Sequence, residues 1–220
     1  MYANPLLIMT KTILPLLALC LLLLSGCAIT STSTAKVKKP QKHYIGLMTL
    51  VVNSDADISQ LDSATYEQHI RGKFNNLEND KYRRHLEKTL VRNLEHPSVQ
   101  TRLVKSADVF DLNTDISYSE FLQKVRATGV DGILFVKQGN YWYNTSYSTV
   151  HFEYTSSTTA SSQPSTSYHT YLIDIDTLQP VWYANSLVEG ISAGFDTLNN
   201  HLARSIFRKL RKDKYILAGY

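Results

Sequence analysis

Two short apolar runs place the strongest limit on the fold of this chain. Residues 44–52 read Tyr-Ile-Gly-Leu-Met-Thr-Leu-Val-Val, and residues 132–136 read Gly-Ile-Leu-Phe-Val. A half-exposed strand alternates apolar and polar residues, whereas a nearly continuous apolar run predicts a strand that is buried on both faces. Helical patterns occupy much of the sequence between and after these runs. We therefore expect an α/β domain in which helices pack on a sheet.

Three longer segments have the periodicity of amphipathic helices. Residues 82–94 repeat an apolar side chain at every fourth position, and residues 195–211 do so again near the end of the chain. Between them, Ser117 and Glu120 form a capping-box pattern at the start of a helix, and Gly129 stands where a left-handed residue is expected after its end. The step from this helix into the strand at residues 132–136 predicts a parallel crossover.

The remaining elements are shorter or less regular. A short helix is expected around residues 66–74 and a modest strand at 101–104. Three more strands are expected at 147–154, 168–176 and 181–188, and the Ser/Thr-rich residues 155–167 are expected to form an exposed hairpin tip. The predicted order is β-α-β-α-β-β-β-β-α, in a single mixed sheet with helices packed on it.

The N-terminus carries an export pattern. Lys11 is the only charged side chain before Cys27, and it precedes an apolar run at residues 13–24. This run is about 18 Å long as a helix, too short for a hydrocarbon core of about 30 Å, but it suits the apolar region of a signal peptide. The start is either Met1 or Met9, and an ordinary signal peptide with an incidental Cys27 is the alternative.

The run Leu24-Ser25-Gly26-Cys27 resembles the lipobox of bacterial lipoproteins. The resemblance implies that Cys27 receives a diacylglyceryl group and becomes the first residue of the mature protein. In Gram-negative lipoproteins an aspartate after the cysteine is the usual signal for retention in the inner membrane. Ala28 stands there in this chain, which implies an outer-membrane anchor that faces the periplasm.

Four segments follow from this processing. They are a signal peptide at 1–26, the lipidated Cys27 with a flexible linker at 27–43, a single α/β domain at 44–214 and a C-terminal tail at 215–220. Removing the signal takes away one of the 23 basic residues and none of the 19 acidic ones, so the formal charge becomes +3, which does not indicate nucleic acid. Because the other cysteine, Cys20, lies in the signal, a disulfide framework is excluded.

Five segments together resemble a group of envelope lipoproteins. They are the buried strand at 44–52, the helix at 82–94, the Gly-Val-Asp-Gly-Ile-Leu-Phe-Val run at 129–136, and the strand pair at 172–176 and 181–184. The group includes the peptidoglycan-synthase activator LpoB, the curli secretion protein CsgG and the amino-terminal domain of TolB. The resemblance implies a non-catalytic domain that binds a protein partner in envelope assembly or regulation. Residues 53–78 and the Ser/Thr-rich tip depart from the group.

Candidate catalytic groups are few, and the nucleotide-binding, zinc-protease and nucleophile-elbow motifs are absent. His151, Glu153 and His169 have spacings that would allow either a zinc ion or a general-base pair. Solvated cross-strand pairing explains the same residues without function. Asp174 and Asp176 precede a turn, where aspartate commonly accepts backbone N–H bonds. We predict no catalytic residue, no metal and no cofactor.

Aromatic residues gather in the predicted meander. Trp182 is a candidate core residue, while Tyr141, Tyr143 and Tyr147 are candidates for an outward surface that contacts a protein or a sugar. Strand-forming aromatics that simply cover a sheet are the alternative explanation.

A basic run closes the last predicted helix. Arg208, Arg211 and Lys212 belong to it, and cations near a helix C-terminus complement the helix dipole. A docking patch for an anionic lipid, a glycan or an acidic protein is the second explanation.

The sequence therefore favours a lipid-anchored envelope protein that binds an unknown envelope protein and touches the membrane through the lipid on Cys27. A binder of cell-wall glycan, such as peptidoglycan, or of a small ligand is the alternative, and an envelope hydrolase is a third hypothesis. The type of envelope and the oligomeric state are left open by the sequence.

Overall fold

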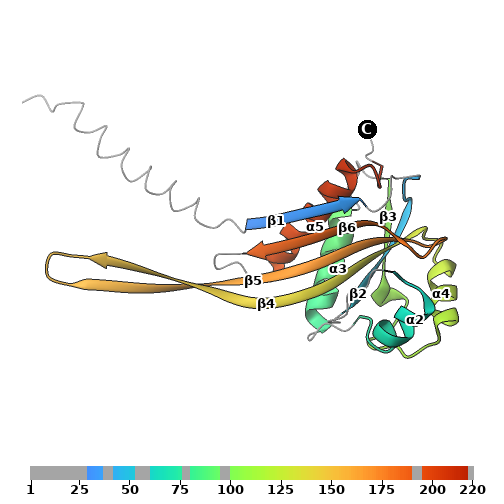
Figure 1. Ribbon diagram of the computed structural model, residues 1–220, viewed down its shortest axis with the longest axis horizontal. Helices are drawn as coiled ribbons and strands as arrows, with labels where there is room; N and C mark the ends of the chain where they lie inside the picture. The colour runs from blue at the N-terminus through green and yellow to red at the C-terminus, as the bar shows by residue number, and fades with distance from the viewer. Residues whose placement is uncertain are drawn as a thin grey trace, which may run out of the picture.

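The computed structural model describes residues 29–36, 42–52, 60–75, 80–94, 100–189 and 195–217. The chain forms one six-stranded mixed sheet with helices packed on it (Figure 1). The strands are β1 (Ile29–Lys36), β2 (Gly46–Val52), β3 (Arg102–Lys105), β4 (Gly132–His151), β5 (Ser156–Asp174) and β6 (Pro180–Glu189). The helices are α2 (Ser63–Thr65), the π-helical turn η2 (Tyr66–Ile70), α3 (Asp80–Leu94), the 3-10 turn η3 (Ser106–Asp108), α4 (Tyr118–Ala127) and α5 (Phe195–Lys212).

The strand order in the sheet is β1-β6-β5-β4-β2-β3. β2 lies parallel to both β3 and β4, which confirms the predicted parallel crossover. The pairs β4–β5, β5–β6 and β1–β6 are antiparallel. The predicted fold class, a single mixed sheet with packed helices, is therefore confirmed.

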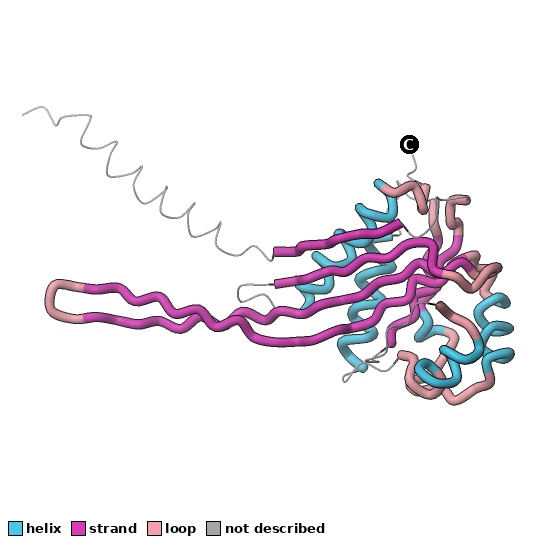
Figure 2. Tube along the Cα trace, in the orientation of Figure 1, coloured by secondary structure: helices cyan, strands magenta, loops and turns pink. Residues whose placement is uncertain are grey.

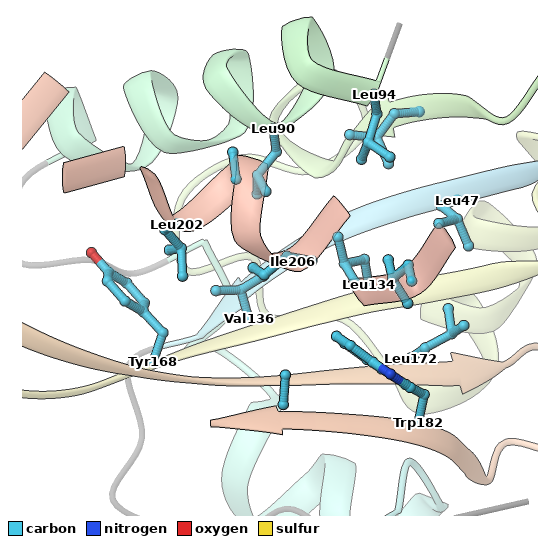
Figure 3. Packing of buried hydrophobic residues seen from close by; sticks show 14 of the residues in the cluster. Leu47, Leu90, Leu94, Leu134, Val136, Tyr168, Leu172, Trp182, Leu202 and Ile206 are labelled. Carbon is cyan, nitrogen blue, oxygen red and sulfur yellow. The ribbon is translucent and has the colours of Figure 1, made fainter. Parts of the chain in front are cut away.

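Each face of the sheet has its own hydrophobic core, because successive residues of a strand point to opposite faces. Leu134 and Val136 of β4 join a core with leucines of α3 and α5, and Trp182 is fully buried in it (Figure 3). Ile133 and Phe135 join the other core, which contains aromatic rings from η2 and α4. The apolar run at 132–136 and the β2 part of the run at 44–52 are thus buried on both sides, as predicted, while Ile45 just before β2 is exposed.

Local signals around α4 are also confirmed. Ser117 caps the helix by accepting a hydrogen bond from the Glu120 backbone N–H at 3.3 Å, and Gly129 adopts a left-handed φ of 71°. Gly132 is required by packing, since a Cβ there would lie 2.7 Å from the Tyr44 ring and 2.8 Å from the Leu47 side chain. The short helix expected at 66–74 ends at Ile70, and Phe74 instead forms a bridge to Val52.

Three sequence predictions are wrong. The linker expected at 27–43 contains strand β1, which pairs along its whole length with β6. A Ser/Thr-rich segment needs no apolar face to occupy a sheet edge, because backbone hydrogen bonds alone hold it there. Likewise, the Ser/Thr-rich residues expected as a hairpin tip lie mostly within β5, and the strands expected at 132–136 and 147–154 are one continuous strand, β4.

The C-terminal tail expected at 215–220 begins with core residues. Tyr215 and Ile216 are buried, and the Tyr215 carbonyl accepts a hydrogen bond from the Tyr44 backbone N–H at 2.8 Å. The Tyr215 hydroxyl in turn donates to the Val181 carbonyl at 2.8 Å. The folded body therefore begins before residue 44 and continues past residue 214, the two bounds that the sequence predicted.

Candidate binding surfaces

The most prominent feature of the surface is an arm formed by residues 142–165, the outer parts of β4 and β5. It projects far beyond the body (Figures 1 and 2). Its register runs from Trp142 opposite Ser165 to His151 opposite Ser156. No third described strand follows it outward, because the pairing of β6 with β5 stops at Ser165 and the pairing of β2 with β4 stops at Lys137. At about 3.3 Å per residue, the arm is about 30 Å long.

Local contacts define both ends of the arm. At the base, the β4–β5 register shifts between Gln138 and Tyr141, a bulge of the kind that bends a strand. Asn144 then donates from Nδ2 to the Ser165 hydroxyl and to the Glu189 carboxylate, each at 3.1 Å. At the tip, the Phe152 N–H donates to the Thr155 carbonyl at 2.7 Å and closes the turn.

The arm is uncharged over nearly all of its length and carries exposed apolar groups. Glu153 is its only Asp, Glu, Lys or Arg residue. Five of the seven large hydrophobic side chains exposed on the described surface belong to it: Tyr143 (60%), Tyr147 (72%), Val150 (52%), Phe152 (63%) and Tyr154 (91%). Free strand edges are usually protected by charges or proline, and this arm has few of either. Large exposed apolar patches of this kind are common at sites that bind other molecules.

The structure confirms the core position of Trp182 and the exposure of two of the predicted tyrosines, while their contact with a protein or a sugar stays a prediction. Trp182 is buried and donates from Nε1 to Asp213 at 2.9 Å, while Tyr143 and Tyr147 are exposed. Tyr141 lies in β4 at the base of the arm. Val150, Phe152 and Tyr154, at the tip of the arm, are also exposed, but they were not among the predicted site residues. Their alternation along the strand is the sequence signal that could have identified them.

The start of β1 lies level with the base of the arm. Ile29 pairs with Glu189, and Glu189 pairs with Ser165. β1 therefore runs from Ile29, level with the arm's base, back into the body. Cys27 and the other lipobox residues, Leu24, Ser25 and Gly26, lie outside the described residues. Among the helices of the described ranges, none has the length and apolar character needed to span a bilayer.

The structure does not bring the predicted histidines together. His151 pairs with Ser156 near the tip of the arm, whereas His169 pairs with Lys137 inside the body. Thirteen residues of β5 separate the two positions, a distance of about 40 Å. His169 instead shares a 2.7 Å hydrogen bond between Nδ1 and the Tyr183 hydroxyl. In the part of the chain that the structure covers, no group of three potential metal ligands occurs.

Asp174 acts in a turn, as predicted. Its Oδ1 accepts hydrogen bonds from the backbone N–H groups of Asp176 at 3.0 Å and Thr177 at 2.9 Å. Its Oδ2 accepts from Lys42 and from the Tyr44 hydroxyl, each at 2.9 Å. Burial opposes ionisation of Asp174, but the hydrogen bonds from Lys42, Thr177 and Tyr44 outweigh it and lower the pKa of the carboxyl to about 2.

The same contacts act on Tyr44 in the opposite direction. Burial, followed by the hydrogen bond to the Asp174 carboxylate, raises the pKa of the Tyr44 hydroxyl well above its usual range. The hydrogen bond between the two side chains thus favours an ionised Asp174 and a neutral Tyr44. These contacts also join the chain before β2 to the turn after β5.

The predicted basic residues lie on α5 and are separate from the arm (Figure 1). Arg208, Arg211 and Lys212 are all exposed, but only the two arginines line a hollow between α5 and α3. Arg204, Phe207 and Asn93 complete its lining. The arginines at 204, 208 and 211 are spaced four and three residues apart, which places them on one face of the helix. This spacing is the feature of the sequence that could have predicted the hollow's arginine lining.

Comparisons with known proteins find similarity at the level of structure. No family model matches the chain, and no curated protein matches its sequence. A PelC dodecamer from Paraburkholderia phytofirmans is similar at a TM-score of 0.49 and 11% identity, over 83% of this chain and 97% of that one. The lipoprotein GNA1162 from Neisseria meningitidis has a TM-score of 0.36 and 13% identity, over 76% and 98% of the two chains.

A third similar structure is a putative neuraminyllactose-binding hemagglutinin homolog from Helicobacter pylori. Its TM-score is 0.36 and its identity 10%, over 81% of this chain and 89% of that one. These similarities are distant, and no function is transferred from them to this chain.

Proposed function

We propose that this chain is a lipid-anchored envelope lipoprotein whose non-catalytic α/β domain binds a protein partner through the arm. The observation that carries the proposal is the concentration of exposed apolar side chains on the arm, headed by Tyr147 and Tyr154. Tyrosine gives a large contact area at a small entropic cost and is enriched at the centre of protein interfaces. An arm with two free strand edges also offers backbone groups to a partner strand.

The position of the anchor supports the same proposal. β1 begins two residues after Cys27, so at most about 7 Å of chain would join a lipid on that thiol to the sheet. The flexible linker that the sequence predicted at 27–43 would have allowed a much longer reach. We propose that the lipid holds the base of the arm at the outer membrane and that the partner lies within about 30 Å of that base, the length of the arm.

Site-specific photocrosslinking in cells tests the proposal. A benzophenone amino acid replaces Tyr147 in one strain and Leu112 in a control strain, since Leu112 is an exposed apolar residue of the body (43%). The expected result is one discrete protein adduct from position 147 and none from position 112. Equal adducts from both positions, or none from either, would contradict a partner-binding arm.

The alternative is a binder of cell-wall glycan. Tyr143 and Tyr147 are four residues apart on one strand, so they share a face of the arm, and exposed rings of this kind can stack on sugars. Pelleting with purified peptidoglycan distinguishes the two functions. Glycan binding predicts that the protein pellets and that Tyr143→Ala with Tyr147→Ala abolishes pelleting. The protein-partner function predicts no dependence on these two rings in this assay.

A further inference from the structure

Three arginines of α5 face one hollow between α5 and α3. Arg204, Arg208 and Arg211 line it together with Phe207 and with Asn93 of α3, and its volume is about 230 Å³. All three arginines are exposed, so the hollow opens to solvent, while Phe207 is half-buried and packs on the core. Next to it, the Arg92 guanidinium of α3 donates to the Asn200 side chain of α5, which links the two helices.

Among the residues that the structure describes, no acid pairs with these arginines. Within the described ranges, none of the three takes part in an ion pair or a side-chain hydrogen bond. The acids nearest in the chain are engaged elsewhere, since Asp196 pairs with His85 and Asp213 accepts from Trp182. Like charges three or four residues apart on a helix repel each other. The three guanidinium groups therefore gather at a cost to the helix.

The helix dipole does not explain the whole set. Its attraction for cations is confined to the last turn of a helix, and α5 ends at Lys212. Arg211 lies in that turn, but Arg204 lies more than two turns before the end. Lys209 and Lys212 belong to the same stretch of helix and do not line the hollow. The arrangement thus contains a set of arginines that faces the hollow and a separate set of lysines that does not.

We infer that this hollow, the α5 arginine site, binds a phosphate-bearing anion. Guanidinium groups form paired, charge-assisted hydrogen bonds with phosphate oxygens, and a tetrahedral phosphate can accept from several of them at once. The volume is below the range of pockets that enclose a whole drug-sized ligand, and it suits a phosphate or diphosphate group whose remaining part lies outside. Phe207 offers an apolar surface to that part. The phosphate belongs either to a free phosphate ester or to a phospholipid headgroup.

Two charge-matched double variants test the site in the purified full-length protein. Arg208→Gln with Arg211→Gln removes two charges that line the hollow, and Lys209→Gln with Lys212→Gln removes two charges from the same helix outside it. Calorimetric titration with inorganic pyrophosphate measures the binding of a free, soluble phosphate compound. The expected result is an affinity about tenfold or more weaker in the arginine variant and within about twofold of wild type in the lysine variant.

Binding of the protein to lipid vesicles tests the other source of phosphate, a phospholipid headgroup. Cosedimentation with phosphatidylcholine vesicles that contain 20% phosphatidic acid is compared between the two variants. Both variants keep the N-terminal region, so any binding through that region is common to them. A loss confined to the arginine variant assigns the site to the headgroup when pyrophosphate does not bind, and to phosphate in general when it does.

Two outcomes overturn the inference. One is the absence of any binding to pyrophosphate or to the vesicles that depends on Arg208 and Arg211. The other is an equal loss in both variants, which would mean that overall positive charge is responsible. Thermal unfolding measured without ligand shows whether the variants are folded. Because repulsion is relieved, the arginine variant is expected to unfold at a temperature equal to or above that of wild type.

Discussion

Asp174 is the group whose replacement tests the electrostatics of the structure most sharply. Its side chain is only 10% exposed, and it accepts hydrogen bonds from Lys42, Tyr44 and the Thr177 backbone. Asp174→Asn keeps the size of the side chain but removes the negative charge that these donors share. We therefore expect the variant to fold and to be less stable than wild type at neutral pH.

The lowered pKa sets the magnitude. A carboxyl whose pKa falls from 3.8 in the unfolded chain to about 2 in the folded protein contributes about 2 kcal/mol to the free energy of unfolding at neutral pH. Since the folded-state pKa is the lower one, this contribution is fully present above pH 4 to 5 and is lost as the pH falls through 2. The stability gap between wild type and Asp174→Asn should follow the same course, from about 2 kcal/mol at pH 6 to about 1 kcal/mol at pH 3.

Urea unfolding at pH 6, 5, 4 and 3, followed by circular dichroism, measures that gap. Asp176→Asn is the matched control, because Asp176 also contacts Lys42 but its side chain is 77% exposed. An exposed ion pair is worth less than about 1 kcal/mol, so the control should differ little from wild type at every pH. A gap for Asp174→Asn that does not change with pH would refute the charge-based explanation.

Three further predictions concern packing and the arm. Gly132→Ala should lower the free energy of unfolding by about 1–3 kcal/mol in urea titrations, because its Cβ meets Tyr44 and Leu47; wild-type stability would show that the two side chains can move aside. Tyr215→Ala should cost about 3–5 kcal/mol by the same measurement, since the ring is fully buried; a negligible effect would restore the view of these residues as a tail. Replacing residues 144–163 by a two-residue turn should leave the melting temperature within a few degrees of wild type, because the arm belongs to neither core cluster, and should abolish the crosslinked adduct; a large drop in melting temperature would show that the arm supports the body.

Much of the body could be predicted from the sequence, because its signals depend on burial. The run at 44–52 must be covered on both faces, and the structure places Leu47 and Val51 in one core and Met48 and Leu50 in the other. The capping pattern at Ser117 also marks the start of α4 correctly, since a helix must satisfy its first N–H groups wherever it lies.

The errors have a common physical origin. β1 and the outer part of β5 are both rich in serine and threonine, and neither has the alternating apolar pattern of a half-buried strand. Their strand structure comes from backbone pairing with a neighbour, Ile29 with Glu189 and Thr158 with Thr149, and this pairing leaves no periodic trace in the sequence. The same limit applies to the α5 arginine site, whose second wall comes from Asn93, more than a hundred residues earlier in the chain.

We propose that a lipid on Cys27 holds the arm within reach of a protein partner. Photocrosslinking from position 147, carried out in cells with wild-type Cys27 and with Cys27→Ser at matched expression, tests both parts of the claim together. We predict a single discrete adduct with wild-type Cys27 and a strongly reduced yield with Cys27→Ser. An adduct of equal yield in both strains would contradict the role of the anchor, and the absence of an adduct with wild-type Cys27 would contradict the role of the arm.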